Sequence, residues 1–370
     1  MRILQIVLAL IFAGFAPVAA SAQSWTVQNS GMDTDLRGVS AAYFTDAQGA
    51  VKPVIWACGS NGVILRSTDQ GKTWKRLRVG GGEKLNFRGV VAFDADVALV
   101  MSIGNADKSR IYKTTDGGAT WQLQFTGPRK ETFLDAIACY TKLHCFALGD
   151  PIDGKFLFLE TTDGEQWHDV SRDTMPDALP KEGAFAASNT SLSVHGHDLY
   201  FGTGATARAR VFHSPDFGRT WSVTETPIAS GNDSSGIFSL DARRAPMLLA
   251  VGGDYNEPAL HGRAAAFSRD DGKTWEPAQQ QPGGFRSAVS VIDDAIAVAV
   301  GPNGIDVTGD RGATWKRVDS SLNLNAVAIL DLKNGWAVGP KGTIARFPGL
   351  EKYLVRNIRP DGEQTSAARP

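Results

Sequence analysis

Residues 67–74, Ser-Thr-Asp-Gln-Gly-Lys-Thr-Trp, decide the fold, because the pattern S-x-D-x-G-x-T-W that they form is repeated along the chain. Further copies end at Trp121, Trp167, Trp221, Trp275 and Trp315, and the copy that ends at Trp167 is one residue shorter. An Asp that opens a turn accepts hydrogen bonds from backbone N–H groups two residues on, and a Gly two positions after the Asp can adopt a positive φ. The Thr and Trp that follow suit the start of an outgoing strand. The copies therefore predict a series of equivalent hairpin turns, which is a folding signal rather than a catalytic one.

The spacing of the copies predicts the size of the repeated unit. Trp74 and Trp315 are 241 residues apart over five intervals, which gives a mean period of about 48 residues. Four strands of about 5 to 6 residues with their turns need roughly 40 to 50 residues, which is the size of one β-propeller blade. We therefore expect an all-β protein, a propeller of four-stranded antiparallel blades that form a single domain.

The repeated motif resembles the Asp-box, or BNR, repeat. Its copies make the chain similar to the propellers of the photosystem II stability and assembly factor family and, more distantly, of sialidases. The resemblance covers nearly the whole chain after the N-terminal leader, and it implies the propeller fold. It implies little about activity, because one fold carries many functions. No residue ties the chain to a photosystem partner, so the photosynthetic role is not carried over.

Seven blades are expected, and the last one is incomplete on its own. Six blades contain a copy of the motif, whereas the seventh has three strand-like stretches, at 324–329, 335–338 and 343–347, and no copy. Residues 24–29 resemble the Trp-led outer strands of the other blades. We therefore expect the N-terminal strand to complete blade seven, which would close the ring and remove its last open sheet edge.

The N-terminus has the features of a secretory signal peptide over residues 1–22. Arg2 is followed by an apolar run from Ile3 to Phe15 and by the cleavage motif Ala20-Ser21-Ala22. The expected organisation is a signal peptide at 1–22, a propeller at 23–348 and a flexible C-terminal tail at 349–370. No later stretch has the ~20 apolar residues that a membrane-spanning helix needs. The sequence predicts a periplasmic or secreted protein without a membrane span.

Composition and charge limit the kinds of partner. The chain is 42% hydrophobic and 21% charged with a net charge of −1, as is usual for a soluble globular protein. Its scattered basic residues form no electrostatic footprint for nucleic acid or an anionic membrane. His195 and His197 are expected in a hairpin turn, so no metal site is predicted. No cofactor motif is found, and we expect a monomer.

The three cysteines fit an oxidising compartment. Cys139 and Cys145 flank a short turn, so they could face each other across a hairpin and form a disulfide, but the sequence leaves the oxidised and reduced states open. Cys58 lies in an apolar strand and is expected to be a small buried hydrophobe.

The candidate ligand site lies on the face opposite the motif turns, where the innermost strand of each blade begins. Arginine recurs there in Leu36-Arg37-Gly38, Phe87-Arg88-Gly89 and Phe285-Arg286-Ser287, and Asp135 takes the same place in Leu134-Asp135-Ala136. Three guanidinium groups near the channel would suit a carboxylated ligand. The other candidate ligand-binding residues are in nearby loops: Asp153, His261 and Arg263. The alternative is that the arginines pair with Asp135, Asp150, Asp153 and Asp254 and simply close the channel.

Two functions follow from this site. The first is a binding or assembly module with a ligand or partner site at the central channel, whose partner is an unknown protein or an acidic carbohydrate. The second is a sialidase-like glycoside hydrolase or lyase that acts on an acidic sugar. Its candidate catalytic residues, by location, are Asp150, Asp254, Tyr255 and Glu257, although Asp-Pro and Asp-Gly pairs also form turns. The Arg-Ile-Pro motif that sialidases carry before the first Asp-box is absent, which favours the binding module.

Overall fold

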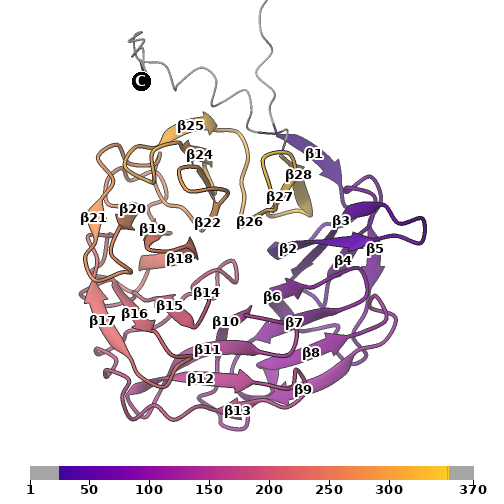
Figure 1. Ribbon diagram of the computed structural model, residues 1–370, viewed down its shortest axis with the longest axis horizontal. Helices are drawn as coiled ribbons and strands as arrows, with labels where there is room; N and C mark the ends of the chain where they lie inside the picture. The colour runs from indigo at the N-terminus through magenta and orange to yellow at the C-terminus, as the bar shows by residue number, and fades with distance from the viewer. Residues whose placement is uncertain (1–24, 348, 350–370) are drawn as a thin grey trace, which may run out of the picture.

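Seven antiparallel sheets of four strands each surround a central axis in the computed structural model, which describes residues 25–347 and residue 349 (Figure 1). The expected seven-bladed propeller is confirmed. The expected signal peptide at 1–22 and nearly all of the expected tail at 349–370 lie outside the described residues. None of the helices in the described part of the chain is long and apolar enough to cross a membrane.

The first three blades follow one another along the chain. They consist of β2 (Leu36–Thr45), β3 (Val51–Gly59), β4 (Ile64–Ser67) and β5 (Lys75–Leu77); β6 (Asn86–Ala92), β7 (Ala98–Ile103), β8 (Arg110–Thr114) and β9 (Gln122–Thr126); and β10 (Leu134–Cys139), β11 (Cys145–Ile152), β12 (Lys155–Thr161) and β13 (His168–Asp169). A short 3-10 helix, η1 (Ala106–Lys108), lies between β7 and β8.

The next three blades repeat the same order. They consist of β14 (Leu192–His195), β15 (Asp198–Gly202), β16 (Arg210–Ser214) and β17 (Ser222–Glu225); β18 (Ser235–Arg244), β19 (Met247–Asp254), β20 (Ala265–Ser268) and β21 (Glu276–Pro277); and β22 (Ala288–Val291), β23 (Ala297–Gly301), β24 (Gly304–Thr308) and β25 (Lys316–Asp319). In every blade the first of these strands lies nearest the axis (Figure 1).

Blade seven is completed by the N-terminus, as expected. Its strands β26 (Ala326–Ile329), β27 (Gly335–Val338) and β28 (Thr343–Arg346) are joined by β1 (Thr26–Asn29), which pairs antiparallel with β28. Trp25 is buried and its ring contacts Phe347, with 5.2 Å between the ring centroids. The two ends of the propeller domain are therefore held in one sheet.

The repeated motif builds each outer hairpin through side chains. In the first copy the Asp69 carboxylate accepts hydrogen bonds from the Thr73 backbone N–H at 2.9 Å and from the Thr73 hydroxyl at 2.6 Å. The Ser67 hydroxyl accepts from the Gly71 N–H at 2.8 Å, and Gly71 has the expected positive φ of 80°. The Trp74 indole then donates to the Gly71 carbonyl at 3.1 Å. The Asp carboxylate thus reaches the backbone N–H four residues on, rather than two as the sequence suggested.

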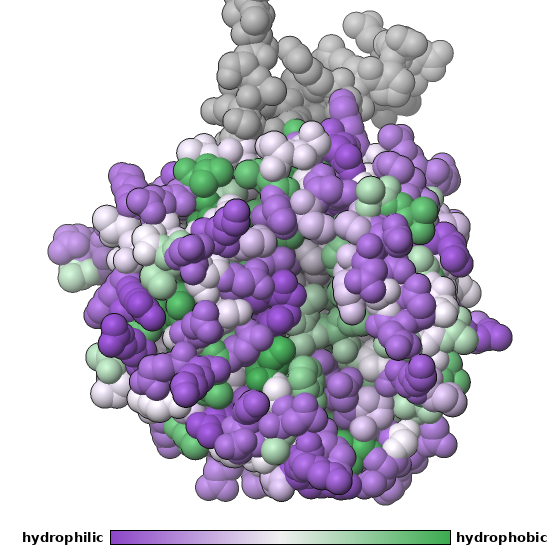
Figure 2. Space-filling view, turned by 180° about the vertical axis from the view of Figure 1, so that it is seen from behind, coloured by the Kyte–Doolittle hydropathy of each residue, from purple (hydrophilic) through white to green (hydrophobic). Residues whose placement is uncertain are grey.

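Apolar side chains fill the spaces between neighbouring blades. One core cluster joins Val54 and Trp56 of blade one to Phe87 and Tyr112 of blade two. Because each blade covers its faces against the next one, the ring forms a single folded unit. Seen from behind, the molecule has a hollow near its centre with apolar surface inside it and hydrophilic side chains around it (Figure 2).

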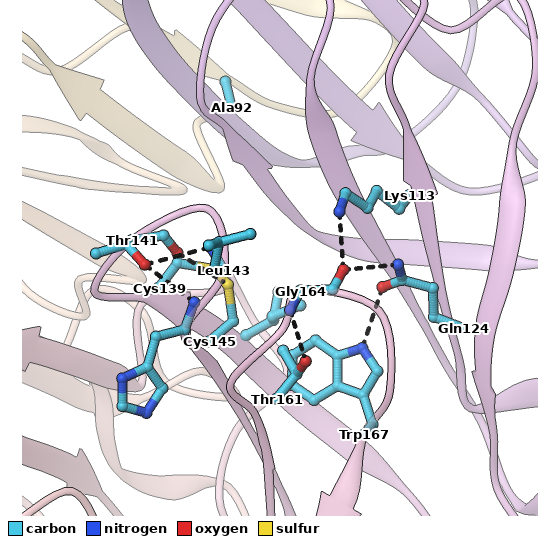
Figure 3. Close-up of a disulfide and its surroundings, with 12 residues drawn as sticks. Ala92, Lys113, Gln124, Cys139, Thr141, Leu143, Cys145, Thr161, Gly164 and Trp167 are labelled. Atoms are coloured by element: carbon cyan, nitrogen blue, oxygen red, sulfur yellow. Dashed lines mark hydrogen bonds between the residues drawn. A yellow bond between two sulfur atoms is a disulfide. The ribbon is translucent and has the colours of Figure 1, made fainter.

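Cys139 and Cys145 form a disulfide, which settles the alternative that the sequence left open. They are directly paired residues of β10 and β11, on either side of a turn in blade three. The close-up shows the bond beside the shortened motif copy, where Trp167 donates to the Gln124 side chain at 3.2 Å (Figure 3). Cys58 is completely buried, as expected.

Blade four departs from the expected pattern. Its inner strand β14 begins only at Leu192, 25 residues after the motif copy that ends at Trp167. Residues 183–190 instead reach four other blades. The Ala186 carbonyl accepts from Arg88, the Asn189 side chain bonds the Ile137 backbone, and the hydroxyls of Ser188 and Thr190 bond Ser287 and Ser239. We call residues 183–190 the crossing segment, because it links blades two, three, five and six across the channel.

Candidate functional site at the channel mouth

A cavity of about 590 Å³ opens where the inner strands begin. Its lining comes from the starts of inner strands, from loops on the same face and from the crossing segment, with the residues Arg37, Arg88, Ile103, Phe133, Asp135, Asp150, Ala184, Phe185, Ala186, Ala187, Phe238, Tyr255, Phe285, Ser287, Pro302 and Asn325. The face chosen from the sequence therefore carries a cavity.

In four blades a β-bulge places one side chain in this cavity. The register between the inner strand and its neighbour shifts at Arg37 in blade one, at Arg88 in blade two, at Asp135 in blade three and at Phe238 in blade five. A bulge adds one unpaired residue and turns its side chain away from the ladder. All four of these residues line the cavity. We call this place the bulge position.

Ser287 and Asn325 occupy the bulge position in blades six and seven. Gly38, which follows Arg37, pairs with Cys58, and the equivalent pairs are Ala288 with Val300 and Ala326 with Val338. The residues that precede Ala288 and Ala326, namely Ser287 and Asn325, both line the cavity. Blade four has no such residue in the lining, because the crossing segment supplies Ala184 to Ala187 there.

The expectation that Arg286 lies beside Arg37 and Arg88 was wrong by one position. The backbone N–H of Arg286 bonds the preceding blade at Gly252, as the N–H of Leu36 bonds Gly339, so Arg286 is the equivalent of Leu36. A shift of one residue turns a strand side chain to the other face of the sheet. The Arg286 side chain is 0% exposed and forms an ion pair with Asp306 of β24. It is not among the residues that line the cavity.

Arg37 and Arg88 form the basic wall of the cavity. Arg88 donates to the Ala186 carbonyl at 2.9 Å and to the Asn86 side chain at 3.4 Å, and no carboxylate within the described chain forms an ion pair with it. Arg37 lies 3.4 Å from the Asp35 carboxylate, while its buried Nε has no partner among residues 25–347. Burial, followed by the charge of Arg37, lowers the pKa of Arg88 to about 10. An anion between the two guanidinium groups would relieve this repulsion.

Asp135 and Asp150 form the acidic wall. Burial raises the pKa of Asp135 well above its ordinary value, and the nearby charge of Asp150 raises it further. Burial also raises the pKa of Asp150 to about 6, although a hydrogen bond from the Ala184 N–H opposes this rise. Asp150 is itself a bulge residue, at the register shift between β11 and β12. The expected channel-closing ion pairs between these two acids and the arginines do not form in the described chain.

Aromatic rings form the third wall. The ring of Phe185 from the crossing segment stacks on Phe238 with 3.8 Å between centroids. Phe285 and Tyr255 meet Phe238 edge to face at 4.7 and 5.9 Å. The cavity therefore offers cationic, acidic and apolar surfaces to one ligand, a combination that suits an amphipathic chain molecule.

The remaining candidate residues lie outside the cavity lining. Asp153 is in an exposed turn and pairs with Arg129 at 2.7 Å, whereas Glu257, His261 and Arg263 are exposed in the loop between β19 and β20. Asp254 accepts hydrogen bonds from the Ser234 hydroxyl at 2.6 Å and from the Asn232 amide at 2.8 Å. Burial alone would raise the pKa of Asp254, but these bonds outweigh it and the pKa is lowered. Of the four catalytic candidates, only Asp150 and Tyr255 line the cavity.

The hydrolase hypothesis is not favoured by this geometry. It relied on three arginines around one carboxylate, and only two reach the cavity.

Within residues 25–347 no group of three or more His, Cys, Asp or Glu residues could hold a metal ion. His195 and Asp198 are paired at the end of the β14–β15 hairpin, as the turn interpretation predicted.

Sequence analysis missed Phe185, Phe238, Ser287, Asn325 and the crossing segment. The signal for the segment was the long interval between Trp167 and the next strand pattern. A second signal was the set Gly183, Gly204 and Gly236, whose backbones pair where the segment enters the channel. A Cβ on Gly236 would lie 2.4 Å from the Gly204 Cα, so only glycine allows this approach.

Comparisons with known proteins agree with the fold. The BNR/Asp-box repeat family matches residues 65–76, which include the first motif copy. The chain carries the BNR/Asp-box repeat. No curated protein matches the chain. This BNR propeller is similar to the solved structure of YCF48 bound to D1 peptide, with a TM-score of 0.62 and 15% identity over 87% of this chain and 96% of that one.

A second similar structure is YCF48 from Cyanidioschyzon merolae, with a TM-score of 0.62 and 17% identity over 87% of this chain and 98% of that one. At these identities the likeness establishes the shared fold. The resemblance to the photosystem II assembly factor propellers, given above from the motif, is thereby confirmed at the level of the fold.

Proposed function

We propose that this BNR propeller is a periplasmic or secreted binding module that holds a polypeptide segment of a partner protein in the channel-mouth cavity. The observation that carries the proposal is the pair Arg37 and Arg88, half-buried beside an aromatic wall, with Arg88 lacking a carboxylate partner in the described chain. Such a pair binds an acidic group of a ligand through charge-assisted hydrogen bonds, while the rings bury its apolar parts.

Two further observations support a polypeptide ligand and an exported protein. One of the similar structures, YCF48, is bound to a D1 peptide. The leader at 1–22 has the n-region, apolar run and cleavage motif of a secretory signal. N-terminal sequencing of protein recovered from the periplasm or the medium should begin at Gln23. Recovery of the uncleaved chain from the cytoplasm alone would contradict the proposed location.

The binding function can be tested by selection from a phage library of random 12-residue peptides. We expect wild-type protein to enrich a family of sequences that share an acidic residue. Synthetic peptides of that family should bind Arg88→Gln at least tenfold more weakly, because the charge that faces the ligand is lost. Arg311→Gln is the matched control, since Arg311 is exposed in a motif turn on the opposite face. Failure to enrich any family, or equal binding to wild type and Arg88→Gln, would refute the proposal.

A further inference from the structure

The acidic wall has no role in the binding of an acidic group, and it requires its own explanation. Asp135 is 1% exposed, and neither of its carboxyl oxygens has a hydrogen-bond partner among residues 25–347. The Oδ1 atom of Asp150 also lacks a partner there. Buried polar atoms in native proteins are nearly always hydrogen-bonded, so three unpartnered oxygens that line one cavity indicate a missing donor.

We propose that Asp135 and Asp150 together bind a cationic side chain, a guanidinium or ammonium group, of the polypeptide held in the cavity. This inference rests on the proposed function and adds one requirement to it: the bound segment carries a basic residue. The basic side chain would lie against blade three, while an acidic group of the same segment would lie against Arg37 and Arg88.

The local backbone aims both carboxylates at the same space. Asp135 is the bulge residue of β10 against β11, and Asp150 is the bulge residue of β11 against β12. Two consecutive bulges in one sheet turn both side chains out of the ladder. The crossing segment passes beside them, because a Cβ on Gly183 would lie 2.9 Å from Asp150 Oδ1. The backbone thus leaves the remaining oxygens facing the cavity.

An organic cation fits this site better than a metal ion. Ca²⁺ takes six to eight oxygen ligands, whereas two carboxylates next to phenylalanine rings supply too few. A guanidinium group donates up to five hydrogen bonds in a plane and can bind both carboxylates at once. Its methylene stem is apolar and can pack against Phe185 and Phe238. The repulsion from Arg37 and Arg88 keeps the cation on the acidic side of the cavity.

Protonation of the pair should compete with the cation. The titratable groups that face the pair across the cavity are Arg37, Arg88 and Tyr255. Because the pKa of Asp150 is raised to about 6, its carboxylate is mostly ionised at pH 7.5 and mostly protonated at pH 5. A bound cation favours the ionised form, so its affinity should fall by about tenfold from pH 7.5 to pH 5.

The test uses side-chain analogues, which do not depend on finding the natural partner. Propylguanidinium, the arginine side chain without its backbone, and its uncharged analogue propylurea are titrated into the folded protein and followed by ligand-observed NMR. We expect propylguanidinium to bind in the millimolar range and propylurea at least tenfold more weakly. Asp150→Asn and Asp135→Asn should each reduce propylguanidinium binding at least tenfold. Asp107→Asn, at an exposed site on the same face, is the matched control and should change nothing.

Either of two outcomes of this titration would overturn the inference. Equal binding of propylurea and propylguanidinium would show that charge plays no part, and unchanged binding by Asp150→Asn would place the cation elsewhere. If Asp135→Asn does not fold, Asp150→Asn alone decides. A peptide from the selection gives a further test, in which its Arg or Lys is replaced by norleucine. If its affinity is unchanged by this replacement but still falls in Arg88→Gln, the proposed function stands and this inference alone is refuted.

Discussion

The bulge position shows how single residues determine the chemistry of the cavity. The residue is Arg in blades one and two, Asp in blade three, Phe in blade five, Ser in blade six and Asn in blade seven. The pairing of the residue that follows it is equivalent in these six blades, so the side chain decides whether a wall is basic, acidic or apolar. Chemistry at this position can vary while the repeat that folds the chain stays the same.

Asp150→Asn should change the pH dependence of stability. A carboxyl whose pKa is raised from 3.8 in the unfolded chain to about 6 in the fold destabilises the native state as pH rises through this window. The full shift corresponds to about 3 kcal/mol. We expect the wild-type free energy of unfolding to fall between pH 4 and pH 6.5, measured by denaturant titration at each pH. Asp150→Asn should remove the part of this fall that Asp150 contributes, while the part that comes from the raised pKa of Asp135 remains.

The Asp107→Asn variant provides the comparison for this experiment, because it removes an exposed carboxylate from the same face. Its stability should follow the wild-type curve across the window. Parallel curves for wild type and Asp150→Asn would mean that the Asp150 carboxyl is not perturbed in the folded protein.

The motif carboxylates should have the opposite pH dependence. Hydrogen bonds, first from the Thr120 hydroxyl and then from its N–H, lower the pKa of Asp116 to about 2. A lowered pKa contributes stability that is present above about pH 4 and is lost as pH falls through about 2. Asp116→Asn should therefore reduce the melting temperature at pH 5 and make the variant less sensitive to acid between pH 4 and pH 2. A melting curve identical to that of the wild type at pH 5 would contradict this account of the motif.

At the scale of elements, β1 closes the ring as the outer strand of blade seven. Strand β1 covers the edge of β28, which would otherwise expose unpaired backbone groups. The strand itself is mostly exposed, with Val27 at 59%, whereas Trp25, the residue just before it, is 5% exposed against the core. The N-terminal end of the propeller is therefore held mainly by the pairing of β1 with β28 and by the buried Trp25 indole.

Trp25→Ala should destabilise the protein by about 3 to 5 kcal/mol, the usual effect of removing a large buried ring. It removes the contact with Phe347 and leaves a cavity between blades six and seven. Val27→Ser, two residues further on in β1 and exposed, should change stability by about 0.5 kcal/mol or less. Chemical denaturation followed by circular dichroism measures both. A similar small effect of the two variants would mean that β1 is not required for ring closure.

The elements were largely predictable from sequence, whereas the site was predictable only in part. Motif turns are local, because the hydroxyl, carboxylate, glycine and indole that make them lie within eight residues. The cavity depends instead on register, and a bulge is not visible in a single sequence. Arg286 illustrates the difference, since an offset of one residue moved it from the cavity into a buried pair with Asp306. The path of the crossing segment could not be predicted, because its sequence does not repeat in the other blades.

At the scale of the whole molecule, the crossing segment ties separate blades together. The Asn189 side chain accepts from the Ile137 N–H at 2.8 Å and donates to the Ile137 carbonyl at 3.0 Å, so blade four is bonded to blade three through the channel. Residues of the same segment form part of the cavity lining. Stability of the ring and shape of the ligand site are therefore coupled through one stretch of chain.

Asn189→Ala should lower both stability and affinity. The change leaves two backbone groups of Ile137 without partners, which costs about 2 kcal/mol or more. Asn189 also has a positive φ of 69°, which Ala tolerates poorly. Asn61→Ala is the control for the second effect, because Asn61 has a φ of 57° in an exposed turn. We expect a larger loss of melting temperature at Asn189 than at Asn61, and weaker peptide binding only at Asn189. Equal losses would show that the bonds to Ile137 contribute nothing.

The position of β1 in blade seven also constrains when the protein can fold. Residues 26–29 leave the ribosome, or an export channel, before any other part of the propeller, but the strand with which they pair spans residues 343–346. The first-made strand must therefore remain unpaired until blade seven has emerged. Completion of the ring is consequently the last step of propeller folding, and a chain truncated before residue 343 cannot reach it.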